Sequence, residues 1–228
     1  MSEFSHKPIM LMQCIEGLDI KPNGIYVDGT CGGAGHSKEI AKRIQGGMLY
    51  GLDQDPDAVA VATERLAGLP AKVLHTNFRN AKYALAKEGV EKIDGVLLDL
   101  GVSSYQLDNA ERGFSYKYDA KLDMRMNQQQ ELSAYTIVNE YPYEEIVKIL
   151  FRYGEDPFSK QVARKIEQYR ANKPIETTFE LVDIIKSAYP AKVLNKKGHP
   201  AKKIFQAIRI AVNDELHELE VCLEEACE

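Results

Sequence analysis

The fold is decided by the stretch Ile25-Tyr26-Val27-Asp28-Gly29-Thr30-Cys31-Gly32-Gly33-Ala34-Gly35-His36-Ser37. Its apolar, β-branched and aromatic start predicts a strand, and the glycines that follow predict a tight turn. The apolar spacing of Ile40, Ala41 and Ile44 then predicts a helix. Glycine lets a backbone approach a ligand closely, and the free N–H groups of a helix N-terminus can face that ligand. The stretch therefore predicts the start of a nucleotide-binding unit, although an ordinary strand-to-helix turn would contain similar glycines.

The residues around this loop indicate which ligand it binds. Asp53 follows a second predicted strand, Met48 to Leu52, at the position where an acidic side chain in such folds accepts hydrogen bonds from ribose hydroxyls. The dinucleotide fingerprint G-x-G-x-x-G is not met, because Lys38 stands where the third glycine would be. Asp28, at the end of the first strand, would repel a phosphate and attract a cation. These residues predict S-adenosylmethionine, which carries a sulfonium and an ammonium group.

Length and composition predict a globular protein. The chain has 228 residues, of which 44% are hydrophobic, enough for one large domain or two small ones. Its four cysteines form no C-x-x-C pair and its five histidines lack ligand spacing, so neither a disulfide framework nor a metal site is predicted. No apolar stretch approaches the roughly 18 residues of a membrane span. The expected location is the cytoplasm, with no membrane partner.

Charge is unevenly distributed along the chain. The net charge is −5, yet the segment from Pro157 to Ile210 holds twelve Lys and Arg residues against four Asp and Glu. Such asymmetry favours a surface for a polyanion, although a solvated, lysine-rich helix face would show the same pattern. The residues predicted to bind a nucleic-acid substrate here are Lys160, Arg164, Lys165, Lys196, Lys197, Lys202 and Lys203.

Strands and helices alternate in the first hundred residues. Asp55-Pro56 supplies an N-cap and a first-turn proline for a helix. A third strand is predicted from Lys72 to His75, a helix from Ala81 to Lys87, and a fourth strand from Asp94 to Leu100. The continuous apolar run of the fourth strand is typical of strands that are buried on both faces of a parallel sheet.

Three acidic residues stand at the carboxyl ends of these predicted strands. In open α/β sheets, ligands bind beyond those ends. We therefore expect Asp28, Asp53 and Asp99 to converge on one crevice.

A long segment from Gly101 to about Asn127 shows no sustained period, and loops of this length are usually functional or disordered. It mixes basic and aromatic residues, a combination that suits a wall on which an unstacked base could rest. The alternative is that the aromatic side chains simply pin the loop to the domain. The residues concerned are Arg112, Lys117, Lys121, Arg125, Phe114, Tyr116 and Tyr118.

From Ser133 to Pro190, the pattern predicts helices only and no longer an alternation of strands and helices. One of these helices is predicted to begin at the capping box Thr177-x-x-Glu180. A linker from Lys192 to His199 precedes one long amphipathic helix, which starts at Pro200 and has an apolar stripe reaching Leu223.

Several motifs together resemble the RsmH family, also called MraW, over nearly the whole chain. They are Asp28-Gly29-Thr30 with the glycines, Leu52-Asp53-Gln54-Asp55-Pro56, Leu98-Asp99-Leu100-Gly101-Val102-Ser103-Ser104, Ala110-Glu111-Arg112-Gly113-Phe114-Ser115, Leu122-Asp123-Met124-Arg125-Met126, and His199-Pro200-Ala201 with Asn213-Asp214-Glu215-Leu216. That family methylates N4 of a cytidine in small-subunit (16S) ribosomal RNA.

The resemblance implies an α/β fold of the class I methyltransferase type, with a Rossmann-like parallel sheet and an inserted all-helical domain. It implies an S-adenosylmethionine-binding domain over residues 1–108 and 200–228, and a substrate-recognition insert over residues 109–199. The implied partner is the RNA of the assembled small ribosomal subunit, and the implied role is rRNA processing in ribosome biogenesis.

Individual roles follow by position. The implied cofactor-binding residues are Ala34, Gly35, His36, Asp53, Phe78, Asp99 and Gln106. We expect Asp99 also to be catalytic, accepting a hydrogen bond from the N4 amino group and later its proton. The alternative is that Asp99 only contacts the cofactor. Arg112 and Phe114 are expected to contact the substrate. Two departures from the family pattern are Cys31 in place of Phe and Ala34 in place of Gly, and the Ala34 methyl is expected to crowd the cofactor.

The family continues beyond the long helix into further strands, whereas this chain ends at Glu228. We therefore expect the C-terminal part of the sheet to be missing, with an open strand edge that favours self-association as a homodimer. An alternative function is a truncated, catalytically inactive module that binds cofactor or RNA. A small-molecule methyltransferase is disfavoured by the basic insert.

Overall fold

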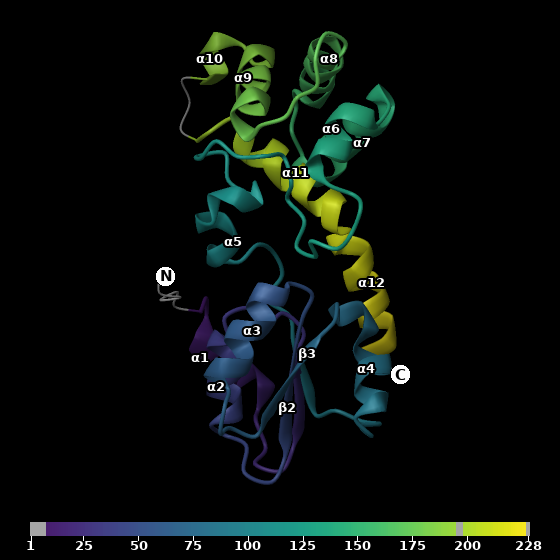
Figure 1. Ribbon diagram of the computed structural model, residues 1–228. Coiled ribbons are helices and arrows are strands. Elements are labelled where there is room, and N and C mark those ends of the chain that lie inside the picture. Colours follow the sequence, from purple (N-terminus) through teal and green to yellow (C-terminus); the bar gives the residue numbers. More distant parts are fainter. Residues whose placement is uncertain (1–7, 195–197, 227–228) are drawn as a thin grey trace. The chain divides into compact units, whose positions relative to one another are not determined.

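The computed structural model describes residues 8–194 and 198–226, and the chain divides into two compact units (Figure 1). The first, here called the sheet unit, extends to Gly101 and includes the chain again from Leu216. The second, the helical unit, runs from Val102 to Glu215. The expected insert, residues 109–199, lies inside the helical unit, which extends beyond it on both sides.

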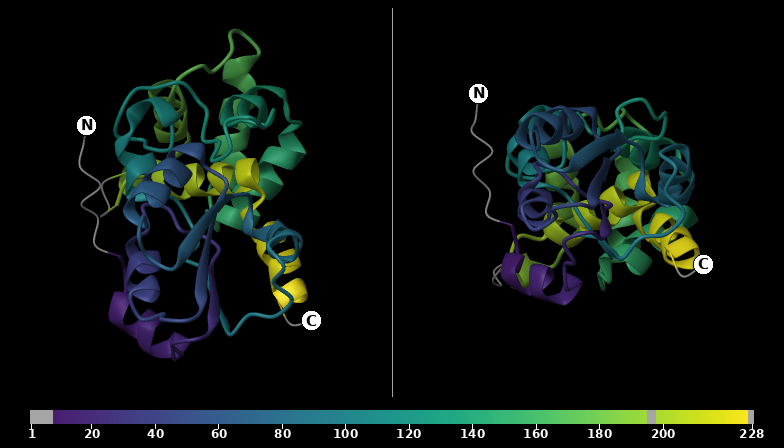
Figure 2. Two further views of the ribbon diagram at one scale, coloured as in Figure 1. Left: turned by 60° about the horizontal axis from the view of Figure 1, so that its bottom comes forward. Right: turned by 90° about the horizontal axis from the view of Figure 1, so that it is seen from below.

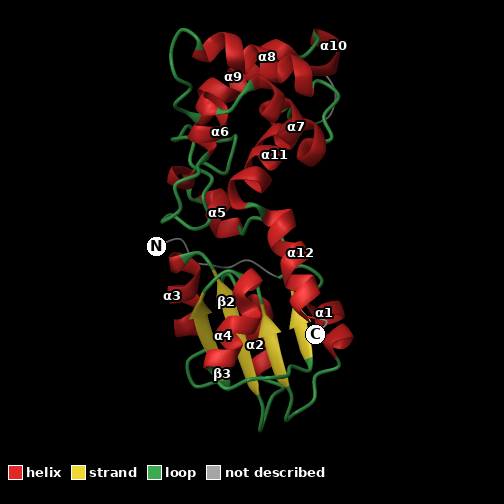
Figure 3. Ribbon diagram, turned by 90° about the vertical axis from the view of Figure 1, so that its right-hand side faces the viewer, coloured by secondary structure: helices red, strands yellow, loops and turns green. Residues whose placement is uncertain are grey.

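Four parallel strands form the sheet of the first unit (Figure 3). They are β1 (Ile25–Asp28), β2 (Met48–Asp53), β3 (Ala71–His75) and β4 (Gly95–Leu97), in the order β3-β2-β1-β4. Parallel strands need crossover connections, and here helices supply them. The predicted Rossmann-like α/β fold is confirmed.

Helices cover both faces of the sheet. On one face, Ile15 and Ile40 pack with Tyr26 of β1 and Leu49 of β2. On the other, Leu85 packs with the neighbouring strand residues. The helices of this unit are α1 (Leu11–Leu18), α2 (Gly35–Ala41), α3 (Pro56–Arg65), the 3₁₀ turn η1 (Phe78–Asn80), α4 (Ala81–Lys87) and α12 (Glu215–Ala226).

Two of these helices show how local sequence determines structure. The predicted cap of α3 is confirmed, because the Asp55 carboxylate accepts the Asp57 N–H at 3.1 Å and Pro56 occupies the first turn. Helix α12 runs beside α4 (Figure 2), and Arg79 of η1 donates to Glu218 of α12 at 3.1 Å. Among the described helices, none combines the length and the apolar character needed to cross a bilayer.

The prediction for the fourth strand was partly wrong. Only Gly95–Leu97 is a strand, and its residues are half-buried rather than buried on both faces. Within the described residues β4 pairs with β1 alone, so one of its edges has no strand neighbour. Asp94 lies outside the strand and accepts the Ile25 N–H with its carboxylate at 2.9 Å.

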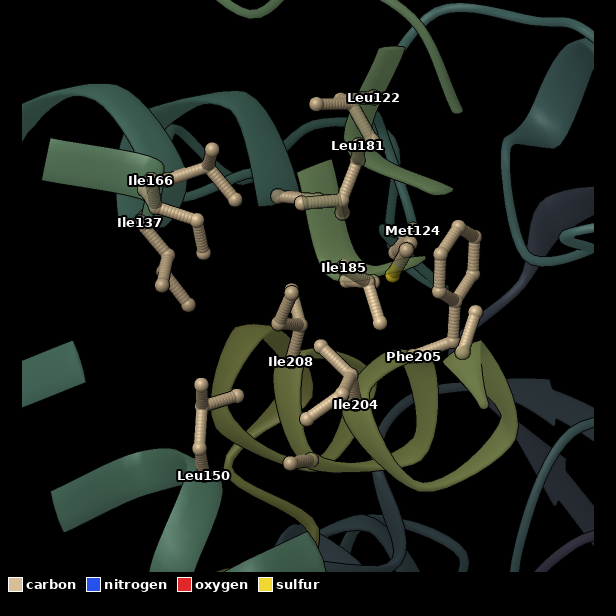
Figure 4. Close-up of a cluster of buried hydrophobic side chains, with 14 of the residues drawn as sticks. Leu122, Met124, Ile137, Leu150, Ile166, Leu181, Ile185, Ile204, Phe205 and Ile208 are labelled. Carbon is tan, nitrogen blue, oxygen red and sulfur yellow. The ribbon is translucent and has the colours of Figure 1, made fainter. Parts of the chain in front are cut away.

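Helices pack around one apolar core in the second unit (Figure 4). Ile204, Phe205 and Ile208 of the helix Ala201–Asn213 (α11) point toward Leu181 and Ile185 of the helix Thr178–Ala188 (α9). The predicted capping box at Thr177 and Glu180 is confirmed at the start of α9. The elements are α5 (Ser104–Asp108), the 3₁₀ turn η2 (Ala110–Arg112), α6 (Ala134–Glu140), α7 (Tyr143–Gly154), α8 (Ser159–Arg170), α9 (Thr178–Ala188), α10 (Ala191–Leu194) and α11 (Ala201–Asn213).

The single long helix predicted after Pro200 is instead two helices. Asp214 adopts a left-handed conformation with φ of 48° and ends α11, and α12 begins at the next residue. The apolar stripe of α11 packs within the helical unit, against α7 and α9. Only one residue, Asp214, separates the two helices, and the helical spacing of apolar residues continues across it. The sequence pattern therefore did not reveal the break.

Asn213, the last residue of α11, holds the long loop of the helical unit in place. Its side-chain amide donates to the carbonyls of Met124 at 2.8 Å and Arg209 at 2.9 Å, and its Oδ1 accepts the Met126 N–H at 2.7 Å. Met124 is fully buried in a left-handed conformation with φ of 58°, which is unfavourable for a side chain with a Cβ. The two hydrogen bonds of Asn213 to Met124 and Met126 hold the loop in this conformation, and the third, to Arg209, fixes the amide on its own helix.

We expect Asn213→Ala to destabilise the helical unit by about 3 kcal/mol, because it leaves buried backbone groups of the loop without partners. Urea unfolding followed by far-UV circular dichroism measures the change. Asn172→Ala is the matched control, since Asn172 also donates to a carbonyl four residues earlier, Gln168 at 3.2 Å, but is exposed. The control should change stability by less than about 0.5 kcal/mol. Equal effects of the two substitutions would contradict the role given to Asn213.

Candidate active site

The loop between β1 and α2 is tied to both neighbouring strands. The Gly29 N–H donates to the Leu97 carbonyl at 2.9 Å, and the Cys31 N–H donates to the Leu52 carbonyl at 3.0 Å. A Cβ on Gly29 would lie 2.5 Å from Leu98 Cδ2 and 3.0 Å from Phe78 Cβ, so only glycine fits here without displacement. The loop is thereby fixed at the carboxyl ends of the central strands.

Asp28 anchors this loop from beneath. Asp28 is 1% exposed. Its two carboxylate oxygens accept hydrogen bonds from the Ser37 hydroxyl at 2.6 Å and from the Thr30 N–H at 3.2 Å. Burial raises the pKa of the carboxyl, while the hydrogen bonds from Ser37 and Thr30 oppose the rise. The Asp28 carboxylate is thus enclosed and bonded within the protein, and its attraction of a cationic ligand stays a prediction.

Asp53 at the end of β2 faces the same loop. Its Oδ2 accepts the Gly32 N–H at 2.8 Å and its Oδ1 accepts the Asp55 N–H at 2.9 Å. Each carboxylate oxygen has a second lone pair, and the residue is only partly buried, so it retains acceptor capacity. Desolvation raises the pKa of Asp53 to about 6. A ligand hydroxyl that donates to this carboxylate would favour its charged form.

Asp99 follows β4 and joins the loop through Thr30. The Asp99 backbone N–H donates to Thr30 Oγ1 at 2.7 Å, while its side chain is 46% exposed. One carboxylate oxygen, Oδ2, lies 3.9 Å from Nδ1 of His36. Asp28, Asp53 and Asp99 thus meet at one loop, as expected, and the crevice predicted there stays a prediction.

The other predicted cofactor residues in this unit lie on or beside the loop. Ala34 has a left-handed conformation with φ of 61° and is buried in the core beneath the loop. Its methyl group therefore packs into that core, and the structure gives no support to the expected crowding of a cofactor. Pro8 packs over Gly35, and Phe78 lies next to Gly29.

Gln106, also predicted to bind the cofactor, belongs to the helical unit. Its side-chain Oε1 accepts the Ser103 N–H at 3.0 Å, and its own N–H donates to Ser103 Oγ at 3.2 Å. These bonds form a capping box that starts α5. A contact of Gln106 with the cofactor stays a prediction.

Two predicted substrate residues, Arg112 and Phe114, are buried in the helical unit. The Arg112 guanidinium donates to the carbonyls of Arg125 at 3.0 Å and Met126 at 3.2 Å, and Phe114 joins the apolar core. Both hold the loop in place, so the prediction that they form an exposed stacking wall was wrong. The exposed aromatic residue of this loop is Tyr118, at 46%. The sequence pattern could not tell Tyr118 from Phe114.

The basic substrate residues are exposed wherever the structure describes them. Lys160, Arg164 and Lys165 lie on α8, and Lys202 and Lys203 lie in the first turn of α11. The remaining two, Lys196 and Lys197, lie outside the described residues.

Comparison with known proteins identifies the family. The family model described as MraW methylase matches residues 3–228. A protein of Exiguobacterium sibiricum named ribosomal RNA small subunit methyltransferase H is 58% identical over 216 residues, which make up 94% of this chain and 69% of that protein. A protein of the same name from Leuconostoc mesenteroides is 56% identical over 229 residues, 99% of this chain and 73% of that protein. The chain belongs to the MraW methylase family.

Two solved structures resemble part of this MraW methylase. One is described as precorrin 8w decarboxylase of Methanobacterium thermoautotrophicum, with a TM-score of 0.34, 23% identity, and coverage of 41% of this chain and 50% of that one. The other is described as a putative rRNA-methylase of Clostridium thermocellum, with a TM-score of 0.34, 20% identity, and coverage of 43% and 57%.

Thr30 and Ser37 are two site residues of this MraW methylase that the sequence pattern did not reveal. Thr30 joins Asp28 to Asp99, and Ser37 satisfies the buried Asp28 carboxylate. In the sequence, both residues carry a hydroxyl and follow Asp28, an acid at the end of a buried strand, by two and by nine positions. Such an acid needs hydrogen-bond donors nearby. Ser37 supplies one with its hydroxyl and Thr30 another with its backbone N–H, while the Thr30 hydroxyl oxygen accepts the Asp99 N–H.

Proposed function

We propose that this MraW methylase transfers the methyl group of S-adenosylmethionine to N4 of a cytidine in small-subunit ribosomal RNA. The observation that carries the proposal is the meeting of Asp53 and Asp99 at the glycine loop, one partly buried and the other half-exposed. The names of the two relatives support the RNA substrate. The reaction would take place in the cytoplasm, where small subunits are assembled.

The residues at the loop fit S-adenosylmethionine. Asp53 accepts one backbone N–H on each carboxylate oxygen and retains acceptor capacity for ribose hydroxyls. Gly32 has a φ of 47° with no protein atom closer than 3.9 Å to its would-be side chain, which leaves room above the loop. When bound, S-adenosylmethionine supplies a methyl group on a positively charged sulfur.

Asp99 carries the proton chemistry in this proposal. The exocyclic amine of cytosine is a weak nucleophile, because its lone pair is delocalised into the ring. Methyl transfer to this nitrogen would leave it positively charged, so a proton must be removed from it. The Asp99 carboxylate accepts a hydrogen bond from N4 and takes its proton late, when the methylated amine is strongly acidic. Its 46% exposure leaves that carboxylate open to a substrate base.

The basic residues of α8 and α11 provide the RNA-binding surface in this proposal. All five described members are exposed on the helical unit. Lysine and arginine contacts to phosphates position an RNA without reading its sequence. Tyr118, flanked by the exposed Lys117, adds a ring on which a base could stack.

Methyl transfer to isolated small ribosomal subunits tests the proposed function. We expect methylated cytidine in the RNA, with the methyl on N4 by mass spectrometry. Asp99→Asn should lower kcat by about 100-fold or more, because an amide cannot take the proton, while the fold is kept. The Leuconostoc mesenteroides relative serves as the control that the subunits are competent. Cofactor binding without any transfer would instead support the catalytically inactive binding module.

Binding of S-adenosylmethionine should depend on pH through Asp53. The raised pKa of about 6 means that the carboxyl is largely protonated at acid pH, and ribose hydroxyls bind the charged form better. Affinity should therefore rise as pH rises through that pKa, by about tenfold between about pH 5 and pH 8. Titration calorimetry measures this, and Asp53→Asn should bind weakly with no such rise. If the affinity of Asp53→Asn rose with pH in the same way, Asp53 would not be the group that causes the pH dependence.

RNA binding should depend on salt through the α8 residues. Phosphate contacts release counterions, so affinity falls steeply with salt concentration. Reversing the charge of Lys160, Arg164 and Lys165 should reduce the slope of log K against log salt by about 2. A matched control, charge reversal of the exposed sheet-unit residues Lys82, Lys87 and Lys92, changes net charge equally. Identical slopes for both triple variants would mean that the α8 face is merely solvated.

A further inference from the structure

A stack of three rings in the helical unit joins its long loop to the start of α11. The rings of Tyr116 and His199 lie face to face, with centroids 4.4 Å apart and planes 9° from parallel. Tyr116 also meets the ring of Phe205 edge-on, at 5.9 Å and 86°. Phe205 is buried in the apolar core (Figure 4), whereas Tyr116 and His199 are only half-buried. The stack therefore leads from the core toward the surface, and His199 is its outer ring.

The protonation state of His199 follows from its hydrogen-bond partner. The backbone N–H of Ala201, in the first turn of α11, donates to Nδ1 at 3.2 Å, so Nδ1 carries no hydrogen. The hydrogen of the neutral ring is then on Nε2. Burial and the positive charge of Lys186 lower the pKa of His199, which favours this neutral form. The ring therefore presents an uncharged aromatic surface at neutral pH.

Two parts of the His199 ring are left for a ligand. Tyr116 covers one face, and the Ala201 N–H faces the Nδ1 edge. Among the residues that the structure describes, no second ring stacks on His199 and no acceptor bonds to its Nε2–H. A ligand can therefore reach the second face and the Nε2 edge.

The charges near the stack favour a polyanion as that ligand. Three exposed lysines neighbour the stack, one in the loop, one in α9 and one in the first turn of α11. They are Lys117, Lys186 and Lys202. Asp183 lies 3.9 Å from Lys186, but its side chain is 80% exposed, so it offsets that lysine only weakly. A flat, neutral ring among lysines suits a nucleobase whose phosphates meet the positive charges.

We propose that His199 is the outer ring of a stacking platform for an unpaired base of the RNA substrate. The inference rests on the proposed function and adds a contact to it, which gives a role to the motif His199-Pro200-Ala201. The base continues the stack on the second face of the ring, and Nε2–H donates to an oxygen of the same strand. Because Tyr116 and Phe205 already hold the ring in place, little side-chain freedom is lost on binding.

Two substitutions separate the aromatic face from the structural hydrogen bond. The side-chain oxygen of asparagine can accept the Ala201 N–H in place of Nδ1, so His199→Asn keeps that bond and loses the face. Phenylalanine keeps the face and loses both ring nitrogens, so His199→Phe tests the opposite change. The matched control is Tyr83→Asn, which removes a 66% exposed ring from α4 of the sheet unit. Urea unfolding checks that each variant is folded.

The probe is a single-stranded RNA oligonucleotide that carries a fluorescent purine, whose emission is quenched when it stacks on an aromatic ring. On the full chain, His199→Asn should raise the Kd of this probe by about 10-fold and reduce the quenching, the scale of one lost base stack. His199→Phe should bind at least about five times tighter than His199→Asn, because it keeps the stack. Tyr83→Asn should stay within about twofold of the wild-type Kd.

The dependence on salt distinguishes stacking from a phosphate contact. The slope of log K against log salt should be the same in His199→Asn and the wild type, because a neutral ring releases no counterion. An unchanged Kd in His199→Asn would overturn the proposal and leave the stack as a link between the loop and α11. A smaller salt slope in that variant, or a wild-type chain that binds no single-stranded RNA, would also overturn it.

A second readout needs neither a variant nor methyl transfer. In proton NMR spectra of the histidine-labelled wild-type chain, the ring signals of His199 should move upfield when the oligonucleotide is added, because the ring current of a stacked base shields them. Signals that stay in place while the RNA binds elsewhere would overturn the platform. If the chain binds RNA with this shift but transfers no methyl group to small subunits, the proposed function fails and the platform stands.

Discussion

A buried carboxylate organises the sheet unit. Asp28 is enclosed at the end of β1, where an unpaired charge would be strongly destabilising. The Ser37 hydroxyl and the Thr30 N–H bond to it, and both belong to the loop and helix that follow. The need to satisfy one buried acid therefore determines the path of the chain from β1 into α2. Thr30, once placed, supports the Asp99 backbone, and Gly32 of the same loop donates to Asp53.

The helical unit depends on an equivalent polar centre, Asn213. Its amide ties α11 to the loop that carries Met124 and Met126, and the Arg112 guanidinium also donates to the Met126 carbonyl. Gly113 has a φ of 69° and lies against the backbone at Lys121, where no side chain fits. The motifs that most clearly mark the MraW family in this unit thus build a loop. A motif that is specific to a family therefore need not contact the substrate.

The sequence predicted best where one local rule decides the outcome. The strand, glycine turn and helix at Asp28, the cap at Asp55 and the capping box at Thr177 each depend on neighbours within a few residues, and all three were found. It predicted least well where tertiary contacts decide. The residue at which α11 ends and the burial of Phe114 depend on packing partners far away in the sequence. An aromatic residue in a loop has the same local pattern whether it is exposed or part of a core.

The three acids at the glycine loop are of one residue type, and their different surroundings suit them to different roles. Asp28 is enclosed and has both oxygens bonded within the protein, so it serves structure. Asp53 is partly buried with its pKa raised, and two backbone N–H groups hold it rigidly, which suits recognition of ligand hydroxyls. Asp99 has a fixed backbone but an exposed carboxylate beside His36, which suits exchange of a proton with a substrate. Asp99 is the most exposed of the three acids, and exchange of a proton with a substrate requires a carboxylate that the substrate can reach.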